Sequence, residues 1–259
     1  MLLMAVCCLP LLPSAVWATC DAIPGADALL RPGAVLLIGE IHGTAEAPRV
    51  IGNLVCAARE AALDVAVGLE IPVTEEAAAH RLLESGDGEE DLAAIAGDFW
   101  QRDYQDGRAS QAMHDLLHAL KRHRPGLHLF FIDNPAAPEG RDRFMASRVA
   151  ATFRERPDAV FIVLTGNIHN RLTIGTRFDA DYEPMGFHVR ELLPDTDVLS
   201  LRITHSGGAA WVCAPECGVR ELEGRPGTMG VELRAPDDGA YTGQLHVGPI
   251  HASLPAKDR

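Results

Sequence analysis

The signature motifs of several enzyme classes are missing from this chain of 259 residues. It contains no G-x-S-x-G, no G-x-G-x-x-G after an apolar run, no Walker A sequence and no H-E-x-x-H. A serine-hydrolase elbow, a dinucleotide site, a P-loop and a zinc-protease helix therefore have no support. Positive charge is also scarce, because 23 Lys and Arg face 36 Asp and Glu, a net charge of -13. We expect no nucleic-acid partner, since phosphates require a basic surface.

Charge is absent altogether from the side chains of residues 1–18, which are mostly apolar. Small residues precede a cleavage point after Ala18, so this segment predicts a secretory signal and a periplasmic or secreted protein. The segment is too short and too interrupted by proline to predict a membrane span, and no transmembrane segment is expected after cleavage. Lipid attachment at Cys20 is the alternative, although Trp17-Ala18-Thr19 matches poorly the sequence expected before a lipidated cysteine.

Cleavage after residue 18 would leave four cysteines, Cys20, Cys56, Cys213 and Cys217. An even number fits an oxidising compartment, and four cysteines allow three pairings. We favour Cys213 with Cys217, which closes a short loop, and Cys20 with Cys56, which ties down an N-terminal arm. A metal site at the C-x3-C is the weaker interpretation, because no second Cys/His pair at zinc-site spacing accompanies it.

Apolar runs typical of buried parallel strands alternate with segments of helical periodicity over roughly 170 residues. This alternation predicts an α/β fold, a mostly parallel sheet flanked by helices on both faces, over residues 19–205. Shorter strands separated by Gly and Pro predict a small C-terminal β-rich extension over residues 206–259, packed on the main domain. The main strands are expected at 34–39, 65–70, 127–132, 159–164 and 198–203, and the helices at 46–63, 74–84, 91–99, 110–122, 139–154 and 186–193.

Polar side chains follow three of these apolar runs. The first run ends in Gly39-Glu40-Ile41-His42, the second in Glu70, and the fourth in Gly166-Asn167-Ile168-His169. Ligands of open α/β sheets bind at the carboxyl ends of the strands, so we expect these side chains to form one catalytic site. The expected catalytic residues are Glu40, His42, Glu70 and His169.

Two histidines and two carboxylates are compatible with two kinds of chemistry. They could bind a divalent metal, through Glu40, His42 and His169, or they could form a metal-free acid–base set. A carboxylate beside His42 could also hold the imidazole tautomer and raise its basicity.

Three further residues are predicted to bind substrate. Arg108 lies in a loop before a helix, and its guanidinium suits a carboxylate or phosphate, although a surface turn residue would look the same. His188 could reach the site from the opposite wall. Trp100 could line the pocket, or it could simply cover the core.

The strand-end motifs resemble a superfamily that groups ChaN-type haem-uptake lipoproteins, erythromycin esterases and Tiki/TraB proteins. The resemblance covers roughly residues 33–205, and it implies an α/β fold with its site at the strand ends. It rests on the motifs at 39–43, 68–72 and 166–169, with 106–113 and 184–186 adding to it.

The branches of this superfamily imply different activities. The esterase branch implies that His42 is a general base activating water, supported by Glu40, Glu70 and His169. The Tiki branch implies metal-dependent peptide hydrolysis by the same residues. The ChaN branch implies haem binding through a tyrosine ligand. None of Tyr104, Tyr182 and Tyr241 falls at a position that can be matched with that ligand.

The leading prediction is an exported hydrolase that cleaves an ester or amide bond in a small-molecule or peptide substrate, with or without a divalent metal. The alternative is a ChaN-like protein that binds haem or iron without catalysis. The sequence predicts no particular oligomeric state.

Overall fold

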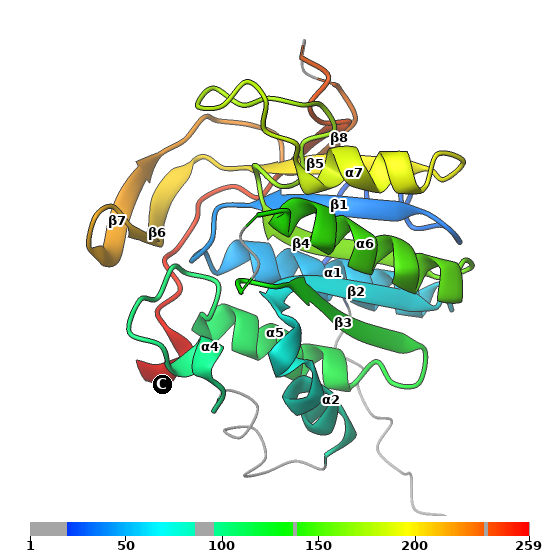
Figure 1. Ribbon diagram of the computed structural model, residues 1–259, viewed down its shortest axis with the longest axis horizontal. Helices are drawn as coiled ribbons and strands as arrows, with labels where there is room; N and C mark the ends of the chain where they lie inside the picture. Colours follow the sequence, from blue (N-terminus) through cyan, green and yellow to red (C-terminus); the bar gives the residue numbers. More distant parts are fainter. Residues whose placement is uncertain (1–19, 86–95, 137–138, 236–237, 259) are drawn as a thin grey trace, which may run out of the picture.

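The computed structural model describes residues 20–85, 96–136, 139–235 and 238–258 (Figure 1). The predicted signal segment 1–18 and most of the predicted helix 91–99 lie outside these residues. The middle layer is a seven-stranded sheet in the order β3-β2-β4-β1-β5-β9-β8, parallel except for the antiparallel edge strand β8. Its strands are β1 (Val35–Glu40), β2 (Val65–Pro72), β3 (Leu127–Asp133), β4 (Val160–Gly166), β5 (Val198–Thr204), β8 (Gly230–Glu232) and β9 (Gly243–His246).

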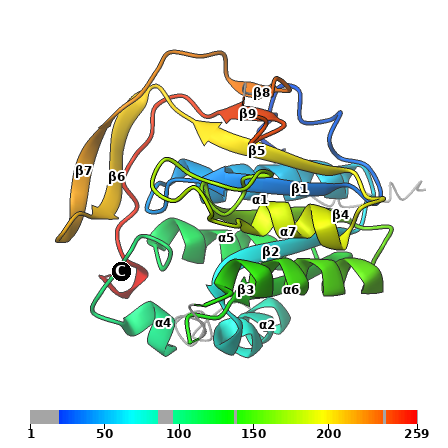
Figure 2. The same cartoon turned by 45° about the horizontal axis from the view of Figure 1, so that its top comes forward.

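Helices cover both faces of this sheet, as the sequence predicts (Figures 1 and 2). The helices include α1 (Glu46–Glu60), α2 (Glu76–Glu84), α4 (Asp98–Gln101), α5 (Gln111–Lys121), α6 (Arg141–Glu155) and α7 (Met185–Leu192), with 3-10 turns at Val73–Glu75 and Ala256–Asp258. Successive residues of a strand face opposite sides, so each strand feeds two cores. Leu36 and Ile38 pack in a core with α1, α2 and α5, whereas Val35 and Leu37 pack in a core with α6 and α7.

The C-terminal part of the chain contributes strands in two places. β9 extends the main sheet by pairing in parallel with β5, and β8 pairs with β9. β6 (Gly207–Cys213) and β7 (Cys217–Glu223) form a separate antiparallel hairpin. β7 pairs only with β6 and is largely exposed. It therefore lacks the apolar run by which a buried strand is predicted from sequence.

The β6–β7 hairpin lies at the end of the molecule where the parallel strands finish (Figure 1). The backbone N–H of Trp211 donates to the carbonyl of Gly43 over 2.9 Å, and its indole N–H donates to the carbonyl of Gln105 over 2.7 Å. The hairpin is thus attached to the two loops that follow β1 and precede α5. It forms a wall beside the carboxyl ends of the strands.

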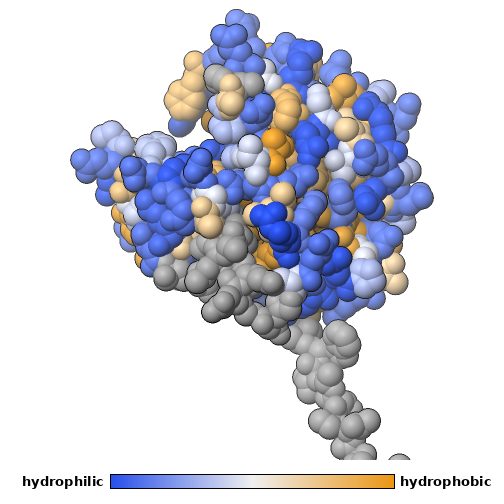
Figure 3. Space-filling model, turned by 60° about the horizontal axis from the view of Figure 1, so that its bottom comes forward, coloured by the Kyte–Doolittle hydropathy of each residue, from blue (hydrophilic) through white to orange (hydrophobic). Residues whose placement is uncertain are grey.

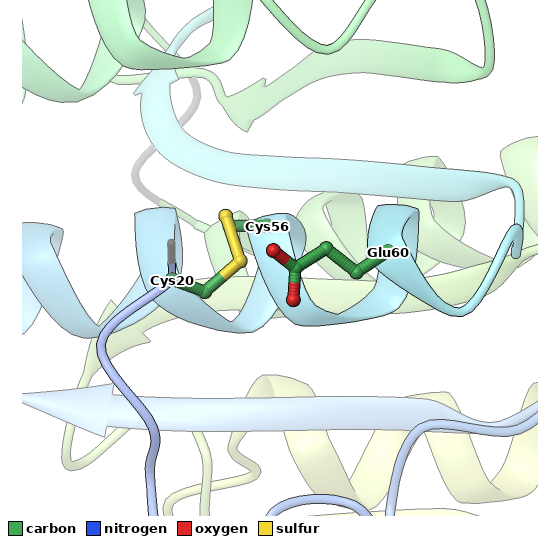
Figure 4. Close-up of side chains that lie close together, drawn as sticks. All are labelled: Cys20, Cys56 and Glu60. Carbon is green, nitrogen blue, oxygen red and sulfur yellow. A yellow bond between two sulfur atoms is a disulfide. The ribbon is translucent and has the colours of Figure 1, made fainter. Parts of the chain in front are cut away.

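Both predicted disulfides are present, Cys20–Cys56 and Cys213–Cys217. The first joins the N-terminal arm to α1 (Figure 4), and the second closes the turn between β6 and β7. Among the described helices, none has the length and apolar content needed to cross a membrane. On the face shown in Figure 3, hydrophilic residues predominate and hydrophobic residues form small patches between them.

The two disulfides should differ in their contribution to stability. In the chain-entropy model, a bridge across 36 residues contributes roughly 4 kcal/mol, and one across 4 residues roughly 2 kcal/mol. We expect Cys20→Ser/Cys56→Ser to lose more unfolding free energy in urea than Cys213→Ser/Cys217→Ser. A larger loss in the hairpin variant would show that the short bridge holds tertiary packing rather than constraining the unfolded chain.

Candidate active site

His42 and Glu40 form a hydrogen-bonded pair just past the end of β1. Glu40 is the last residue of the strand and is 5 % exposed, whereas the His42 side chain is 24 % exposed. The His42 Nδ1 to Glu40 Oε1 distance is 2.9 Å. With an ionised Glu40 as acceptor, Nδ1 carries the proton and the lone pair of the ring lies on Nε2. In the described part of the chain, no hydrogen bond to this Nε2 is present.

Glu70 lies between the two predicted histidines and approaches both of them. Its Oε2 is 3.6 Å from His42 Nε2, and its Oε1 is 3.8 Å from His169 Nε2. Both distances exceed a hydrogen bond but allow strong electrostatic interaction, because the carboxylate is only 5 % exposed. The backbone N–H of Gly166 donates to Oε2 over 2.8 Å, and Arg141 Nη2 donates to Oε1 over 2.6 Å.

The environment of Glu70 keeps it ionised. Burial acts to raise the pKa of Glu70, but the nearby imidazoles of His169 and His42 and the guanidinium groups of Arg108 and Arg141 outweigh burial and hold the pKa well below its usual range. A permanent negative charge therefore lies between the two imidazoles.

His169 belongs to a second hydrogen-bonded group, together with residues that the sequence analysis does not single out. Its Nδ1 is 2.8 Å from Asp142 Oδ1 and 3.0 Å from the hydroxyl of Tyr182, which donates to Asp142 Oδ2 over 2.9 Å. Its Nε2 is 3.1 Å from Arg141 Nη1. A guanidinium can only donate, so Nε2 is the acceptor and Nδ1 carries the proton. The lone pair of His169 is therefore occupied.

Arg141, Asp142 and Tyr182 do not follow apolar strands, and so no strand-end pattern reveals them. Arg141 and Asp142 form the first turn of α6, which begins close to the end of β3. Tyr182 lies in the loop between β4 and α7. One signal was available in the sequence, because the segment after β3 must start at the same edge of the sheet as His42 and Glu70.

Two arginines bracket the buried carboxylate of Asp133, at the end of β3. Asp133 is fully buried, with Arg141 Nε 2.7 Å from Oδ1 and Arg108 Nη1 2.6 Å from Oδ2. Arg108 also donates from Nε and Nη2 to Asp106 Oδ2, over 3.1 and 2.8 Å. Burial acts to lower the pKa of Arg108, but the charges of Glu70, Asp106 and Asp133 raise it. Arg108 thus lies in the cluster and forms ion pairs with these three carboxylates.

The other two predicted substrate-binding residues, Trp100 and His188, make their contacts with other partners. Trp100, on α4, is 1 % exposed and belongs to the core on the α1 side of the sheet, with Phe99 packed edge-on against it. His188, on α7, is buried, and its Nε2 lies 3.3 Å from Glu183 Oε2. Neither is in recorded contact with Glu40, His42, Glu70 or His169, so their assignment to substrate stays a prediction.

The two G-x-x-H motifs pack against each other through their glycines. β1 and β4 are neighbours, with Glu40 opposite Gly166. A Cβ placed on Gly166 would lie 3.1 Å from His42 Nε2, and one placed on Gly39 would lie 2.8 Å from Asn167 Oδ1. Each glycine leaves room for a side chain of the other motif. This close approach explains why both motifs require glycine.

A resident metal ion needs several ligand atoms that converge on one point. In the described part of the chain, three His, Cys, Asp or Glu ligand atoms come within 4.8 Å of one another only in Cys20, Cys56 and Glu60 (Figure 4). These two sulfurs form a disulfide and are not the thiolates that bind metal. Glu40, His42 and His169 do not converge in this way, and Arg108 and Arg141 already neutralise Glu70. The residues therefore do not fit a resident cation, and metal binding stays a prediction.

Haem ligation by a tyrosine also does not fit this cluster. Tyr182 is the tyrosine in contact with His169, and its hydroxyl is bonded to Asp142. Burial and the charge of Asp142 hold the pKa of Tyr182 far above its usual range, which disfavours the tyrosinate form.

Comparison with known proteins yields a fold and no family. No protein-family model matches the chain, and no curated protein matches it. Among solved structures, a Bacillus cereus protein aligns at 10 % identity with a TM-score of 0.64, covering 90 % of this chain and 92 % of its own. An erythromycin esterase EreC mutant in its open conformation aligns at 14 % identity and TM-score 0.55, covering 76 % and 77 %.

ChaN of Campylobacter jejuni, in a structure of cofacial haem binding, aligns at 11 % identity and TM-score 0.48, covering 69 % of this chain and 84 % of its own. The EreC alignment confirms the predicted likeness at the level of the fold. Identities this low carry no activity across, so the site must be argued from its own residues.

Gly166→Ala should lower activity more than it lowers stability. The added Cβ, 3.1 Å from His42 Nε2, would push the imidazole by a few tenths of an ångström, and we expect roughly a tenfold loss of kcat/KM, since small displacements in a site reduce rate steeply. Gly52→Ala is the matched control, because a Cβ on Gly52, in α1, would lie 3.6 Å from Leu116, an ordinary van der Waals distance. Equal activity of Gly166→Ala and wild type would contradict the role given to the glycine contact.

Proposed function

We propose that this protein is a hydrolase of ester or amide bonds in which His42 is the general base and no metal takes part. The observation that carries the proposal is the difference between the two histidines. His42 Nδ1 is hydrogen-bonded to buried Glu40, and its Nε2 makes no hydrogen bond to the described residues, whereas the Nε2 of His169 accepts from Arg141. Only the first ring is ready to accept a proton.

In the proposed reaction, His42 Nε2 takes a proton from a water molecule as the water oxygen bonds to the carbonyl carbon of the substrate. The tetrahedral intermediate then breaks its bond to the leaving alcohol or amine. The proton on His42 Nε2 passes to that leaving group, which restores the neutral imidazole. Glu40 orients the ring through Nδ1 and stabilises the imidazolium while the proton is held.

The negative charge that develops on the carbonyl oxygen needs a positive partner. Arg141 Nη1 contacts only the neutral ring of His169, at 3.1 Å, and is the donor we assign to the oxyanion. Asp142 and Tyr182 hold His169 in place, and His169 in turn positions this guanidinium. Asp133 and Glu70 anchor the other nitrogens of Arg141, so the donor is preorganised.

We also propose that the protein acts outside the cytoplasm. Two disulfides support this location, since such bonds persist in oxidising compartments. The uncharged, apolar segment 1–18 is consistent with it. The substrate is then a small molecule or peptide of the periplasm or the surroundings of the cell.

Replacing His42 should remove the activity and leave the fold intact. We expect His42→Asn to lower kcat/KM on a panel of p-nitrophenyl esters by about 10² to 10⁴-fold, the usual contribution of a general base. His123→Asn serves as the control, because His123 lies between α5 and β3 near the amino end of the sheet. Circular dichroism should show the same fold for all three proteins. Wild-type turnover in the His42 variant would exclude this residue as the base.

The pH profile should carry the signature of a His42 with a raised pKa. Burial alone would lower the pKa of His42, but the charges of Glu70 and Glu40 outweigh it and raise the pKa above its ordinary value. Only the neutral ring accepts a proton, so kcat/KM should rise with pH and reach half of its maximum above the ordinary imidazole pKa.

Glu40→Gln keeps the shape of the pair and removes its charge. The pKa of His42 should then fall, and the acid limb of the profile should move to lower pH while the maximal rate decreases. An acid limb that stays in place in this variant would show that the limb reports another group, and that the Glu40–His42 pair does not control the rate.

A further inference from the structure

A second surface feature adjoins the segment that leads from β4 to His169, because Asn167 and Ile168 line it. It is a groove of about 1150 Å³ over the side of the sheet that is formed by the neighbouring strands β5, β9 and β8 (Figure 2). Its walls come from the loop between β4 and α7, from β5, and from the segments around β8 and β9. We call it the arginine groove, after four of its lining residues, Arg171, Arg177, Arg202 and Arg234.

The charge of the arginine groove is opposite to that of the whole protein. Two carboxylates line it, of which Asp238 pairs with Arg171 at 3.2 Å and Glu232 accepts from Gln244 at 2.8 Å. Within the described ranges, Arg177, Arg202 and Arg234 have no carboxylate partner within 4.0 Å. Four arginines and two carboxylates give the described lining a net charge of +2, in a chain of net charge -13. This local positive charge attracts anions to the groove.

A buried hydrogen-bond donor without an acceptor also favours an anionic ligand in the groove. Arg171 Nε is buried and has no hydrogen-bond partner among the described residues. Buried polar groups are normally satisfied, and an unsatisfied guanidinium N–H can be satisfied only by an acceptor such as a carboxylate or phosphate oxygen.

Apolar side chains stand beside these cations. Phe178 is 73 % exposed, and Ile168 and Ile174 are also exposed, although all three line the groove. The guanidinium of Arg177 lies 4.4 Å from the centre of the Phe178 ring. Large apolar side chains next to cations suit a ligand in which anionic groups adjoin an apolar part.

The arginine groove and the candidate active site share a short segment of chain. Asn167 and Ile168 line the groove, and the next residue, His169, faces Asp142 and Arg141. The hydroxyl of Tyr241, in the groove, donates to the carbonyl of Asn167 over 2.8 Å. A ligand that contacts Asn167 or Ile168 in the groove would thus touch a residue one or two positions before His169 in the chain.

We infer that the arginine groove binds a ligand that carries at least two anionic groups, carboxylate or phosphate, next to an apolar part. This ligand is the acidic portion of the substrate whose ester or amide bond reaches His42, and this last statement rests on the proposed function. The substrate class is therefore an acidic amphipathic ester or amide rather than a neutral one.

The test is binding of small polyanions, which needs no catalysis. Citrate supplies carboxylates and inorganic tripolyphosphate supplies phosphates, and each is titrated into the full protein by isothermal calorimetry at low and at physiological salt. We expect saturable binding of at least one of them, weaker at higher salt because screening reduces the attraction. Binding of only one identifies the anionic group, and binding of neither overturns the inference.

The site is assigned with two charge-matched double variants. Arg202→Gln/Arg234→Gln removes two exposed arginines of the groove, and Arg81→Gln/Arg190→Gln removes two exposed arginines of α2 and α7. We expect the groove variant to bind at least about tenfold more weakly and the control to stay within about twofold, since charge-assisted hydrogen bonds are lost only in the first. Equal weakening in both would show attraction by net charge alone and would overturn the inference.

The same titration with His42→Asn separates this inference from the proposed function. Polyanion affinity should be unchanged in that variant, because His42 does not line the groove. In the wild-type protein, polyanion binding without ester hydrolysis would count against the proposed function alone, and ester hydrolysis without polyanion binding would count against this inference alone. Thermal unfolding of each variant verifies that it is folded during the titration.

Discussion

The buried carboxylate of Glu70 joins four segments of the chain at the carboxyl edge of the sheet. It accepts from the backbone of Gly166 on β4 and from Arg141 on α6, and it lies within 4 Å of both His42 and His169. A buried charge is tolerated only where hydrogen bonds and opposite charges surround it, and removing one partner of such a pair costs about 3–5 kcal/mol. The arginines Arg108 and Arg141 neutralise this carboxylate, and the two histidines lie on either side of it.

The glycines of the paired motifs impose the second constraint. β1 and β4 are adjacent, so the side chains that follow them compete for the same space. Because Gly39 and Gly166 have no Cβ, Asn167 can approach one strand end and His42 the other. Gly107, at φ +93°, meets the backbone of His42 and Gly43 in the same way, and this contact carries Arg108 into the cluster.

Charge is distributed in two ways around this edge of the sheet. In the cluster, Arg108 and Arg141 are matched by Glu70, Asp106 and Asp133, so the cations serve to hold the site together. In the arginine groove, Arg171 pairs with Asp238, and the other three arginines lack such partners among the described residues. A matched network rigidifies a site, whereas unmatched cations are free to bind a ligand. The two neighbouring regions are thus suited to different tasks, chemistry in one and recognition in the other.

The sequence by itself determined the sheet-and-helix architecture, because apolar runs are local patterns, and the even number of cysteines favoured the two disulfides that are present. It also marked Glu40, His42, Glu70 and His169, which follow parallel strands that must end at one edge. Only the tertiary structure decided that Trp100 is buried in the core and that Asp142, Tyr182 and Arg141 surround His169, since these three partners lie 13 to 28 residues away from His169 in the sequence. Such contacts depend on how helices and loops return to the sheet, and no local periodicity encodes that return.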